Sequence, residues 1–493
     1  MSSAKINLAD DAFNIRNMIQ TIIHATDSNN LYMFDIQSRL SMLIHPELRK
    51  AHENLENVDP YYLKKYEYLK KYGFFVDKNT PEFEVVTESM VRESLIETTQ
   101  LVFEVTDSCN LNCTYCGYGD FYEVFDKRSH KNLNIHKAKK LIKYIYELKV
   151  KNNRSELMIG FYGGEPLLNV SFIKKIIDYL NKLNSDQLIN ISYSMTTNAT
   201  LIHRYIDFLV DHNFEVLISL DGNEINNSYR IFNKSEKDTF SVVVGNVDMI
   251  QRIYPIYFEN NISFNAVLHD RNSVKDVYEF IYKRYNKIPE ISELLLYGIK
   301  PEKQNVFRKM FHNVLNSEAE FLLDESNRIP NAHYASLLFE EFKTFFKQYS
   351  INSSLSNIPT LYDSDDKYFP ADTCLPFSLK VFLTVQNRLL PCERINHKYY
   401  LGVVDQDVVI DVNEIANRYN MYYNYLKNVC MHCYAYKYCG LCMFRIVNLD
   451  RLDSEIFACK HFYSQKKFEE KLSRIYSFFE RYPEDYFYVL SNM

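Results

Sequence analysis

Long apolar runs and blocks of like charge are missing from this 493-residue sequence. No stretch holds eighteen consecutive apolar residues, so a membrane-spanning helix is excluded and no membrane partner is expected. Lys plus Arg number 57 against 63 Asp plus Glu, and no basic block is long enough to follow a phosphate backbone, which makes nucleic acid an unexpected partner. Residues 1–30 lack the basic start, apolar stretch and cleavage site of a secretion signal, which predicts a cytoplasmic location.

Cysteine is also scarce, with ten residues in the chain, but the ten fall into two groups. Cys109, Cys113 and Cys116 lie in the stretch CNLNCTYC, just after the apolar run LVFEV, and the other seven follow residue 370. In a reducing cytosol, clustered cysteines are more often metal ligands or catalytic groups than disulfides. Both groups are therefore candidate functional sites.

The region from 100 to 300 alternates between strand-like and helix-like patterns. Strand candidates are LVFEV (101–105), LMIGFY (157–162), INISYSM (189–195), EVLISL (215–220), ISFNAVL (262–268) and ELLLYGI (293–299). Between them, segments such as SFIKKIIDYLNKL place apolar residues at three- and four-residue spacing, on one helix face. The alternation predicts an α/β fold with a mainly parallel sheet, open or closed into a barrel. Such folds carry their chemistry on the loops after the carboxyl ends of the strands.

A set of three thiols is unusual for a single metal ion. Zinc usually takes four protein ligands in a structural site, and the polar neighbours Asn110, Asn112 and Thr114 do not suit a core of unrelated thiols. Three thiolates suit a four-iron cluster whose fourth iron stays open to another ligand. Groups that hold that ligand should then stand on the loops after the next strands.

Such groups do follow the next strands. The second strand candidate ends in FYGGEP, where Gly163 and Gly164 allow close approach of the backbone and Glu165 offers a carboxylate to an amine. The third and fourth end in MTTNAT and SLDG, which supply hydroxyl, amide and carboxylate groups suited to a ribose. Each motif alone is an ordinary turn or helix cap, but four in this order indicate one site.

The order CxxxCxxC, GGEP, TNA, SLDG over about residues 100–300 resembles the radical S-adenosylmethionine (SAM) enzymes. The resemblance implies a partial (β/α)6 barrel in which Cys109, Cys113 and Cys116 hold a [4Fe-4S] cluster that chelates SAM. It also implies SAM contacts from Tyr115 near the adenine, from Gly163, Gly164 and Glu165 to the amine, from Thr197 and Asn198 or Ser219 to the ribose, and from Arg230 to the carboxylate. Asn223 and Asn226 depart from the family's usual proline and histidine.

The later cysteines have a second pattern. Cys430, Cys433, Cys439 and Cys442 form CxxC, five residues, CxxC, which alone would fit a zinc ribbon but would leave three cysteines unused. The seven together resemble the SPASM extension, which implies two auxiliary iron-sulfur clusters of the [4Fe-4S] type. Its ligand sets would be Cys374, Cys392 and Cys442 for the first, and Cys430, Cys433, Cys439 and Cys459 for the second.

Three departures from the SPASM pattern accompany this assignment. Two residues, rather than three, separate Cys439 from Cys442, and Asn387 replaces a glycine five positions before Cys392. Asparagine tolerates the left-handed backbone that such a glycine provides, so the turn can survive. No eighth cysteine stands close before Cys374, so the first cluster is expected to have an open or non-cysteine fourth site.

The expected function is that of a peptide maturase. Radical SAM chemistry implies hydrogen abstraction from a ribosomally made precursor peptide by a 5′-deoxyadenosyl radical, followed by a thioether or carbon-carbon crosslink. Glu393 is the candidate general base, with a surface ion pair to Arg394 as the alternative. One rival is an anaerobic sulfatase-maturating enzyme, which makes formylglycine from Cys or Ser; there an aspartate follows the cysteine that corresponds to Cys392. The other is a zinc-binding interaction protein.

The resemblance also divides the chain and implies partners. The stretch 30–50 with the glycine-stopped helix after it resembles small domains that bind a leader peptide along a strand edge, although a helical cap without a ligand is the alternative. The other expected partner is a reductant such as flavodoxin or ferredoxin. The expected regions are 1–95 (peptide-recognition-like), 96–300 (radical SAM core), 301–370 (helical bridge), 371–465 (SPASM) and 466–493 (tail).

Overall fold

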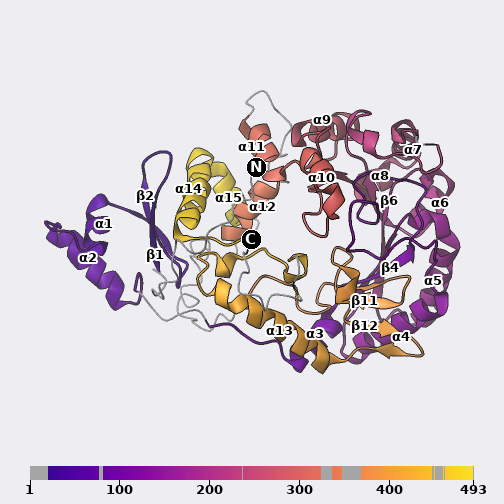
Figure 1. Cartoon of the computed structure of the whole chain (residues 1–493), viewed down its shortest axis with the longest axis horizontal. Helices are drawn as coiled ribbons and strands as arrows, with labels where there is room; N and C mark the ends of the chain where they lie inside the picture. Colours follow the sequence, from indigo (N-terminus) through magenta and orange to yellow (C-terminus); the bar gives the residue numbers. More distant parts are fainter. Residues whose placement is uncertain are drawn as a thin grey trace.

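The computed structural model describes residues 20–76, 82–235, 237–323, 336–346, 368–446, 449, 459 and 461–491. These residues form a three-stranded sheet near the N-terminus and a ten-stranded sheet with the order β13-β12-β11-β10-β4-β5-β6-β7-β8-β9. Figure 1 shows the large sheet and its helices at one end of the molecule and the small sheet at the other. In the described part of the chain, no helix combines the length and apolar character that a membrane span requires.

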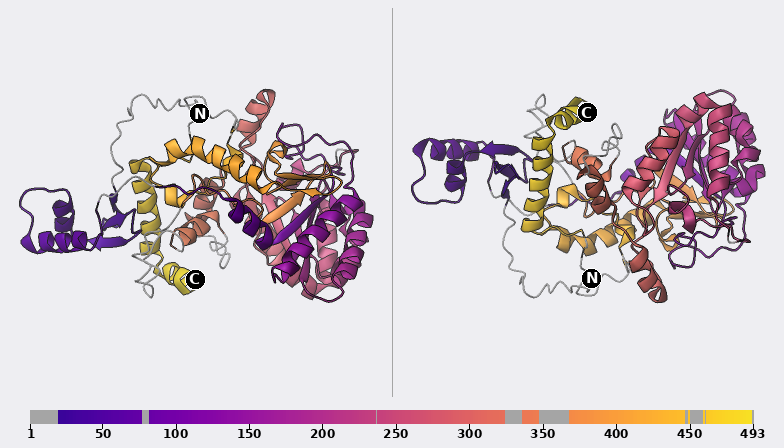
Figure 2. Two further views of the ribbon diagram at one scale, coloured as in Figure 1. Left: turned by 90° about the horizontal axis from the view of Figure 1, so that it is seen from below. Right: turned by 90° about the horizontal axis from the view of Figure 1, so that it is seen from above.

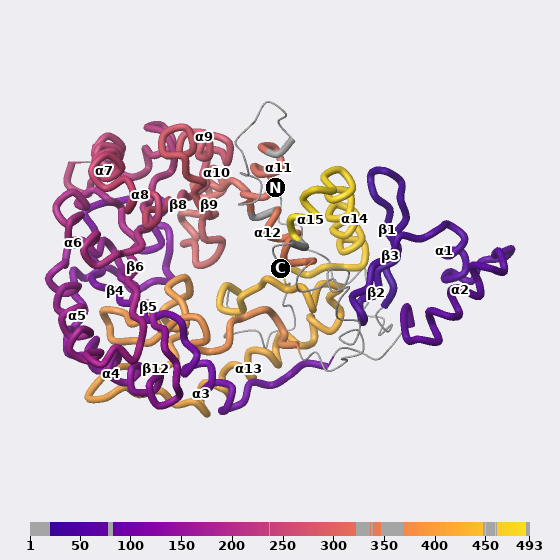
Figure 3. Tube along the Cα trace, turned by 180° about the vertical axis from the view of Figure 1, so that it is seen from behind, coloured from indigo at the N-terminus to yellow at the C-terminus, as the bar shows by residue number. Residues whose placement is uncertain are grey.

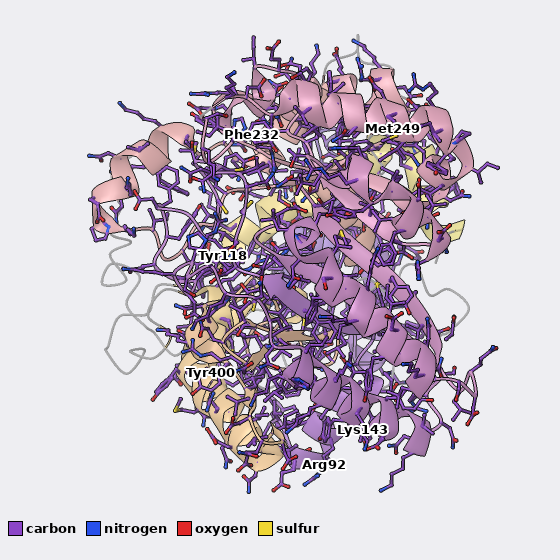
Figure 4. All side chains as sticks on the ribbon, turned by 90° about the vertical axis from the view of Figure 1, so that its right-hand side faces the viewer. Arg92, Tyr118, Lys143, Phe232, Met249 and Tyr400 are labelled. Atoms are coloured by element: carbon purple, nitrogen blue, oxygen red, sulfur yellow. The ribbon has the colours of Figure 1, made fainter. Side chains whose placement is uncertain are left out.

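Six consecutive parallel strands form the middle and one end of the large sheet. They are β4 (Gln100–Thr106), β5 (Glu156–Gly163), β6 (Asn190–Thr197), β7 (Glu215–Ser219), β8 (Ile262–Val267) and β9 (Glu290–Ser292). The helices between them are α4 (Ile135–Lys151), α5 (Val170–Leu183), α6 (Ile206–Asp211), α7 (Phe240–Ile253), α8 (Pro255–Asn261) and α9 (Val274–Tyr285). Figure 4 looks onto this helical layer, with Lys143 on α4 and Met249 on α7. The predicted α/β class with a mainly parallel sheet is confirmed.

The helices cover the sheet because their apolar residues repeat on one face. In α5, for example, Phe172, Ile173 and Ile176 are buried against the sheet, as the spacing predicts. Burial of each such side chain contributes about 1.5–3 kcal/mol.

The sixth predicted strand is displaced. The prediction was 293–299, but β9 covers only Glu290–Ser292. Glu293 instead accepts hydrogen bonds from the Val314 backbone, and Leu294 and Tyr297 pack into a separate apolar cluster beside the cysteine loop. The prediction was wrong because the apolar residues of this segment face that cluster rather than a strand partner.

The C-terminal region continues the same sheet. β10 (Lys380–Leu383) pairs in parallel with β4, and β11 (Arg388–Leu390), β12 (Gly402–Val404) and β13 (Val408–Val409) follow in antiparallel order, before α13 (Val412–Cys430). Asn387, at the turn between β10 and β11, has the left-handed φ of 62°. The expected turn is therefore present without a glycine.

The N-terminal unit stands apart from the large sheet. It contains β1 (Thr21–Ala25), β2 (Leu31–Asp35), β3 (Ser41–Ile44), α1 (Pro46–His52) and α2 (Pro60–Lys71). Figure 2 shows α1 and α2 projecting from the body. The predicted strand at 29–36 and the glycine stop are confirmed, since β2 falls there and Gly73, with φ of 82°, follows α2. β1 packs against the C-terminal helix α14 (Gln465–Arg481), which lies beside it in Figure 3.

The remaining helices connect these parts. They are α3 (Glu88–Glu97), α10 (Gln304–Met310), α11 (Val314–Leu323), α12 (Leu337–Thr344) and α15 (Pro483–Ser491). Residues 324–335 and 347–367 of the expected bridge lie outside the described residues, and the proposed region boundaries stay a prediction.

Candidate active site

A cavity of about 1040 Å³ lies at the carboxyl ends of the parallel strands. It is lined by every residue expected to hold the first cluster or SAM: Cys109, Cys113, Cys116, Tyr115, Gly163, Gly164, Glu165, Thr197, Asn198, Ser219 and Arg230. Glu393 and Cys442 of the C-terminal region line it as well. The structure thus brings together residues more than 300 positions apart, while their individual ligand roles stay predictions.

Two thiols of the cysteine loop, Cys109 and Cys113, are harder to ionise than a free thiol. Burial, with nearby acidic groups and thiols, raises the pKa of Cys109 to about 11 and that of Cys113 to about 12. The loop is fixed by hydrogen bonds from Cys116 N to Cys113 O (3.1 Å) and from Arg128 Nη2 to Cys116 Sγ (3.4 Å). Bound metal would supply positive charge and stabilise the thiolates.

The donor set fits a cluster better than a single ion. Within the described ranges, no three His, Cys, Asp or Glu side chains converge on one metal position. A cluster separates its thiolate ligands by its own width and needs no such convergence. Three thiols with an adjoining large cavity therefore fit an iron-sulfur cluster with an open corner.

The two glycines of FYGGEP allow the end of β5 to pack closely against the start of the cysteine loop. Gly163 has φ of 132°, and a Cβ on Gly164 would come within 2.1 Å of Ser108 O. The Gly164 and Glu165 amides donate to Thr106 O (2.8 Å) and Ser108 O (2.9 Å). Side chains at either glycine would push the end of β5 away from the cysteine loop.

Glu165 is buried and already has protein donors on both carboxylate oxygens. Oε1 accepts from Thr197 Oγ1 (2.7 Å) and Leu167 N (3.1 Å), and Oε2 accepts from Asn198 N (2.8 Å). Burial raises its pKa to about 7 despite these bonds. Glu165 thus fixes the ends of β5 and β6, and its expected contact with the SAM amine stays a prediction.

Asp221, within SLDG, is an important residue that the sequence interpretation passed over in favour of Ser219. Its carboxylate accepts from Arg230 Nε and Nη2 (both 2.9 Å) and from the Tyr115 hydroxyl, and His269 Nε2 lies 3.7 Å away. Burial alone would raise the pKa of Asp221, but the Arg230 guanidinium and His269 hold it well below the usual range. The sequence did carry a signal for this pair: the acidic Asp221 directly follows the fourth strand candidate, and the basic Arg230 comes nine positions later.

The two asparagines that depart from the family pattern complete a turn. The Asn223 amide donates to Asn226 Oδ1 and the Asn226 amide donates to Asn223 Oδ1, each at 3.1 Å. Asn226 Nδ2 also donates to Arg271 O (2.6 Å). The loop that carries Arg230 is therefore held without the usual proline and histidine.

Glu393, from the C-terminal region, also lines the cavity. Its carboxylate pairs with Lys380 Nζ at 3.0 Å, whereas Arg394 Nε lies 3.9 Å away. Burial opposes ionisation, but Lys380 outweighs it and lowers the pKa of Glu393. The expected pair with Arg394 is therefore present at 3.9 Å, but Lys380 is the nearer partner, and the Glu393 side chain is largely buried rather than at the surface.

The seven C-terminal cysteines form two spatial groups. In the second thiol group, Cys430, Cys433, Cys439 and Cys459 line a small cavity of about 20 Å³. In the first thiol group, Cys374, Cys392 and Cys442 all lie near the buried Tyr419 ring. Burial is the main reason that the pKa of every one of these thiols is raised. The partition matches the expected ligand sets, which remain predictions.

Comparisons with known proteins identify the central region. Residues 103–281 match the family model described as the radical SAM superfamily. A cysteine-type anaerobic sulfatase-maturating enzyme of Clostridium novyi is 30% identical over 37% of this chain and 48% of its own. The radical SAM cyclopropyl synthase TigE of Paramaledivibacter caminithermalis is 32% identical over 41% of this chain and 43% of its own.

The chain thus spans about half the length of these curated relatives. A solved structure, native anSMEcpe with bound AdoMet and Kp18Cys peptide, matches 80% of this chain and 100% of its own with a TM-score of 0.52 and 21% identity. At this identity the structural match supports the fold alone. Together the matches support an enzyme rather than a zinc-binding interaction protein.

Proposed function

We propose that this chain is a radical SAM peptide maturase that crosslinks a ribosomally made precursor, since residues 103–281 match the radical SAM superfamily model. One observation carries the proposal. The incomplete thiol set Cys109, Cys113 and Cys116 lines the same cavity, of about 1040 Å³, as the carboxylate of Glu393 from the C-terminal region. Pockets for small molecules measure about 300–1,000 Å³, so this cavity has room for a molecule of the size of SAM.

The residues of the cavity have different proposed roles. When bound, the cluster and SAM would supply a 5′-deoxyadenosyl radical that removes a hydrogen atom from an unactivated carbon. Asp221 holds Tyr115 and Arg230 in place, and Glu165 holds Thr197, so that the groups proposed to bind SAM are fixed before it arrives. Glu393, paired with Lys380, is proposed to accept the proton released when the substrate is oxidised.

The N-terminal unit is proposed to bind the leader of the precursor. β2 lies in the centre of the small sheet, β1 packs against α14, and β3 forms the other edge. A peptide can add to such an edge as a further strand through backbone hydrogen bonds. Leu43 on β3 is exposed and would give that peptide an apolar contact.

A second candidate is formylglycine formation on a sulfatase. It is favoured by the sulfatase-maturating relatives, including one from Clostridium perfringens that is 26% identical over 55% of this chain. The glutamate in PCERIN, where those enzymes are expected to have aspartate, speaks against it. This candidate also gives no role to the β3 edge.

The test is anaerobic reconstitution with iron, sulfide and SAM, followed by co-expression with small peptides encoded beside the gene. We expect 5′-deoxyadenosine under strong reductant and a mass loss of two hydrogens per crosslink in the peptide. A peptide with a sulfatase motif serves as the rival substrate. Formylglycine on that peptide, with no change in the peptides encoded beside the gene, would favour the second candidate. If no 5′-deoxyadenosine forms, both candidate functions are wrong.

A further inference from the structure

Two sulfur atoms of the cysteine loop differ in their hydrogen-bond donors. Cys109 Sγ accepts from two neutral groups, Leu111 N at 3.4 Å and Asn198 Nδ2 at 3.8 Å. Cys116 Sγ accepts instead from the guanidinium of Arg128, whose Nη2 lies 3.4 Å away. A full positive charge therefore stands at hydrogen-bond distance from one of the predicted cluster ligands.

The charge of Arg128 has no acidic partner in the part of the chain that the structure describes. No ion pair joins it to Asp or Glu there, and its Nε is buried without a hydrogen-bond partner. Arg230, which lines the same cavity, is different, because the carboxylate of Asp221 accepts from its Nε and Nη2, both at 2.9 Å. The positive charge of Arg128 therefore acts on the cysteine loop without a neighbouring carboxylate to offset it.

Arg128 is held in place through both its backbone and its side chain. Directly after it, Ser129 donates to the Asp107 carboxylate through N (2.8 Å) and Oγ (2.9 Å), and Lys131 N donates to the same carboxylate at 2.8 Å. Since Asp107 directly follows β4, these bonds tie the segment to the end of that strand. The guanidinium carbon lies 5.8 Å from the centroid of the Tyr118 ring, within the range of a cation–π contact. The position of the charge is thus fixed by the protein itself.

A cation at this position acts differently on the two redox states of a cluster. Reduction adds one electron, and hence one negative charge, to a group already bound by thiolates. A positive charge and an N–H donor at a ligand sulfur stabilise the more negative state and so raise the reduction potential. Removal of the charge should therefore make the cluster harder to reduce.

We propose that Arg128 raises the reduction potential of the iron-sulfur cluster held by Cys109, Cys113 and Cys116. The inference rests on the proposed function, which supplies the cluster and SAM, and deepens it. One electron passes to the cluster from a reductant of the flavodoxin or ferredoxin class, and Arg128 makes that transfer more favourable. Because it acts through the Cys116 sulfur, Arg128 is a positioning residue.

The test measures the midpoint potential of this cluster in the full chain. Wild type, Arg128→Leu, Arg128→Gln and Arg128→Lys are reconstituted anaerobically, and their iron contents are compared. Electron paramagnetic resonance then follows the reduced fraction during a redox titration. The spectrum of Cys113→Ala, which lacks a ligand of this cluster, is subtracted to remove the signals of the auxiliary clusters. Lys127→Gln is the matched control, because it removes the exposed positive charge next to Arg128 in the chain.

We expect a lower midpoint potential in Arg128→Leu and Arg128→Gln. At a fixed potential, the ratio of reduced to oxidised cluster should fall tenfold or more, which is about 59 mV for one electron. Arg128→Lys keeps the charge and should change the ratio less than threefold, and Lys127→Gln should match wild type. Formation of 5′-deoxyadenosine by Arg128→Gln should fall with reduced flavodoxin and recover with titanium(III) citrate, a stronger reductant.

The proposal is overturned if Arg128→Leu and Arg128→Gln keep the wild-type potential, or if Lys127→Gln shifts it equally. Loss of iron from all three Arg128 variants would overturn it too, because Arg128 would then be needed for assembly of the cluster. In each of these cases, 5′-deoxyadenosine and crosslinked peptide from the wild-type chain would leave the proposed function intact. Absence of the cluster from the wild-type chain would overturn both.

Discussion

The parallel half and the C-terminal half of the molecule face the same cavity but satisfy their buried polar groups differently. At the strand ends of the parallel half, Glu165 and Asp221 find donors within the protein, and Asp221 is fully paired with Arg230. In the C-terminal half, burial raises the pKa of the thiols in both groups. The first arrangement can form without metal, whereas the second would be completed by the proposed clusters.

The comparison predicts a division of labour between the two halves. Cys113→Ala should abolish 5′-deoxyadenosine formation, because it removes a ligand of the cluster proposed to cleave SAM. Cys433→Ala, in the second thiol group, should allow that cleavage while abolishing the modified peptide. Both products are measured by mass spectrometry after anaerobic reconstitution. Equal loss of 5′-deoxyadenosine in the two variants would remove the proposed division.

Removal of iron should affect amide hydrogen exchange in the two halves differently. After anaerobic chelation, we expect amide hydrogens of residues 371–446 to exchange faster by tenfold or more, since the thiol groups lose the metal that links their segments. Those of β5 and β6 should change little, because the sheet and Glu165 hold them. Hydrogen exchange with mass spectrometry measures both. Uniform acceleration across β5, β6 and α13 would show that the two halves depend on metal alike.

The pairing within the parallel half is tested by Asp221→Asn. The substitution leaves the Arg230 guanidinium buried without its counter-ion, which should lower the free energy of unfolding by about 3–5 kcal/mol. SAM binding should weaken as well, because Tyr115 and Arg230 lose their common acceptor. Urea unfolding and equilibrium dialysis with SAM give the two quantities.

Asp270→Asn is the control for this change, since Asp270 accepts an exposed hydrogen bond from Tyr229 rather than a buried ion pair. It should alter the free energy of unfolding by less than about 0.5 kcal/mol. A similar small effect in Asp221→Asn would mean that the buried pair is not what holds this wall of the cavity.

The parts of the site that the sequence predicted are those with local signals. The cysteine spacing, the glycines of FYGGEP and five of the six strands could be recognised because each depends on residues close together in the chain. The pairing of β10 with β4 joins residues about 280 positions apart and has no local signal. Lys380 and Glu393, 13 positions apart, come together through the antiparallel pairing of β10 with β11. Arg394, the sequence neighbour, was expected as the partner because that hairpin was not predicted.

The same limit applied at the N-terminus. A single strand was expected within residues 29–36, and β1 and β3 on either side of β2 were missed. Both are five residues or shorter, with buried polar side chains such as Thr21 and Ser41 that weaken the apolar alternation. Packing against α14, from the other end of the chain, completes the environment of β1.

The N-terminal unit can be compared with both halves as a third region. It has no cysteine, so its polar groups must be satisfied without metal. His24 on β1 is buried between Tyr32 and Tyr476, and neither ring nitrogen has a hydrogen-bond partner among the described residues. Burial lowers its pKa from 6.5 to about 4, although Glu480 opposes the shift. His24 is therefore neutral in the folded protein over a range in which it is protonated in the unfolded chain.

The sign of the resulting pH dependence follows from that difference. Above pH 6.5 the histidine is neutral in both states, and as pH falls from 6.5 to about 4 the unfolded state gains the proton first. The contact of β1 with α14 should lose up to about 3 kcal/mol across this window. His24→Phe keeps the aromatic packing without the titratable group, so its unfolding free energy should fall less over the same range. Urea unfolding of both proteins between pH 7 and pH 4 measures the effect, and parallel curves would mean that His24 does not couple this contact to protonation.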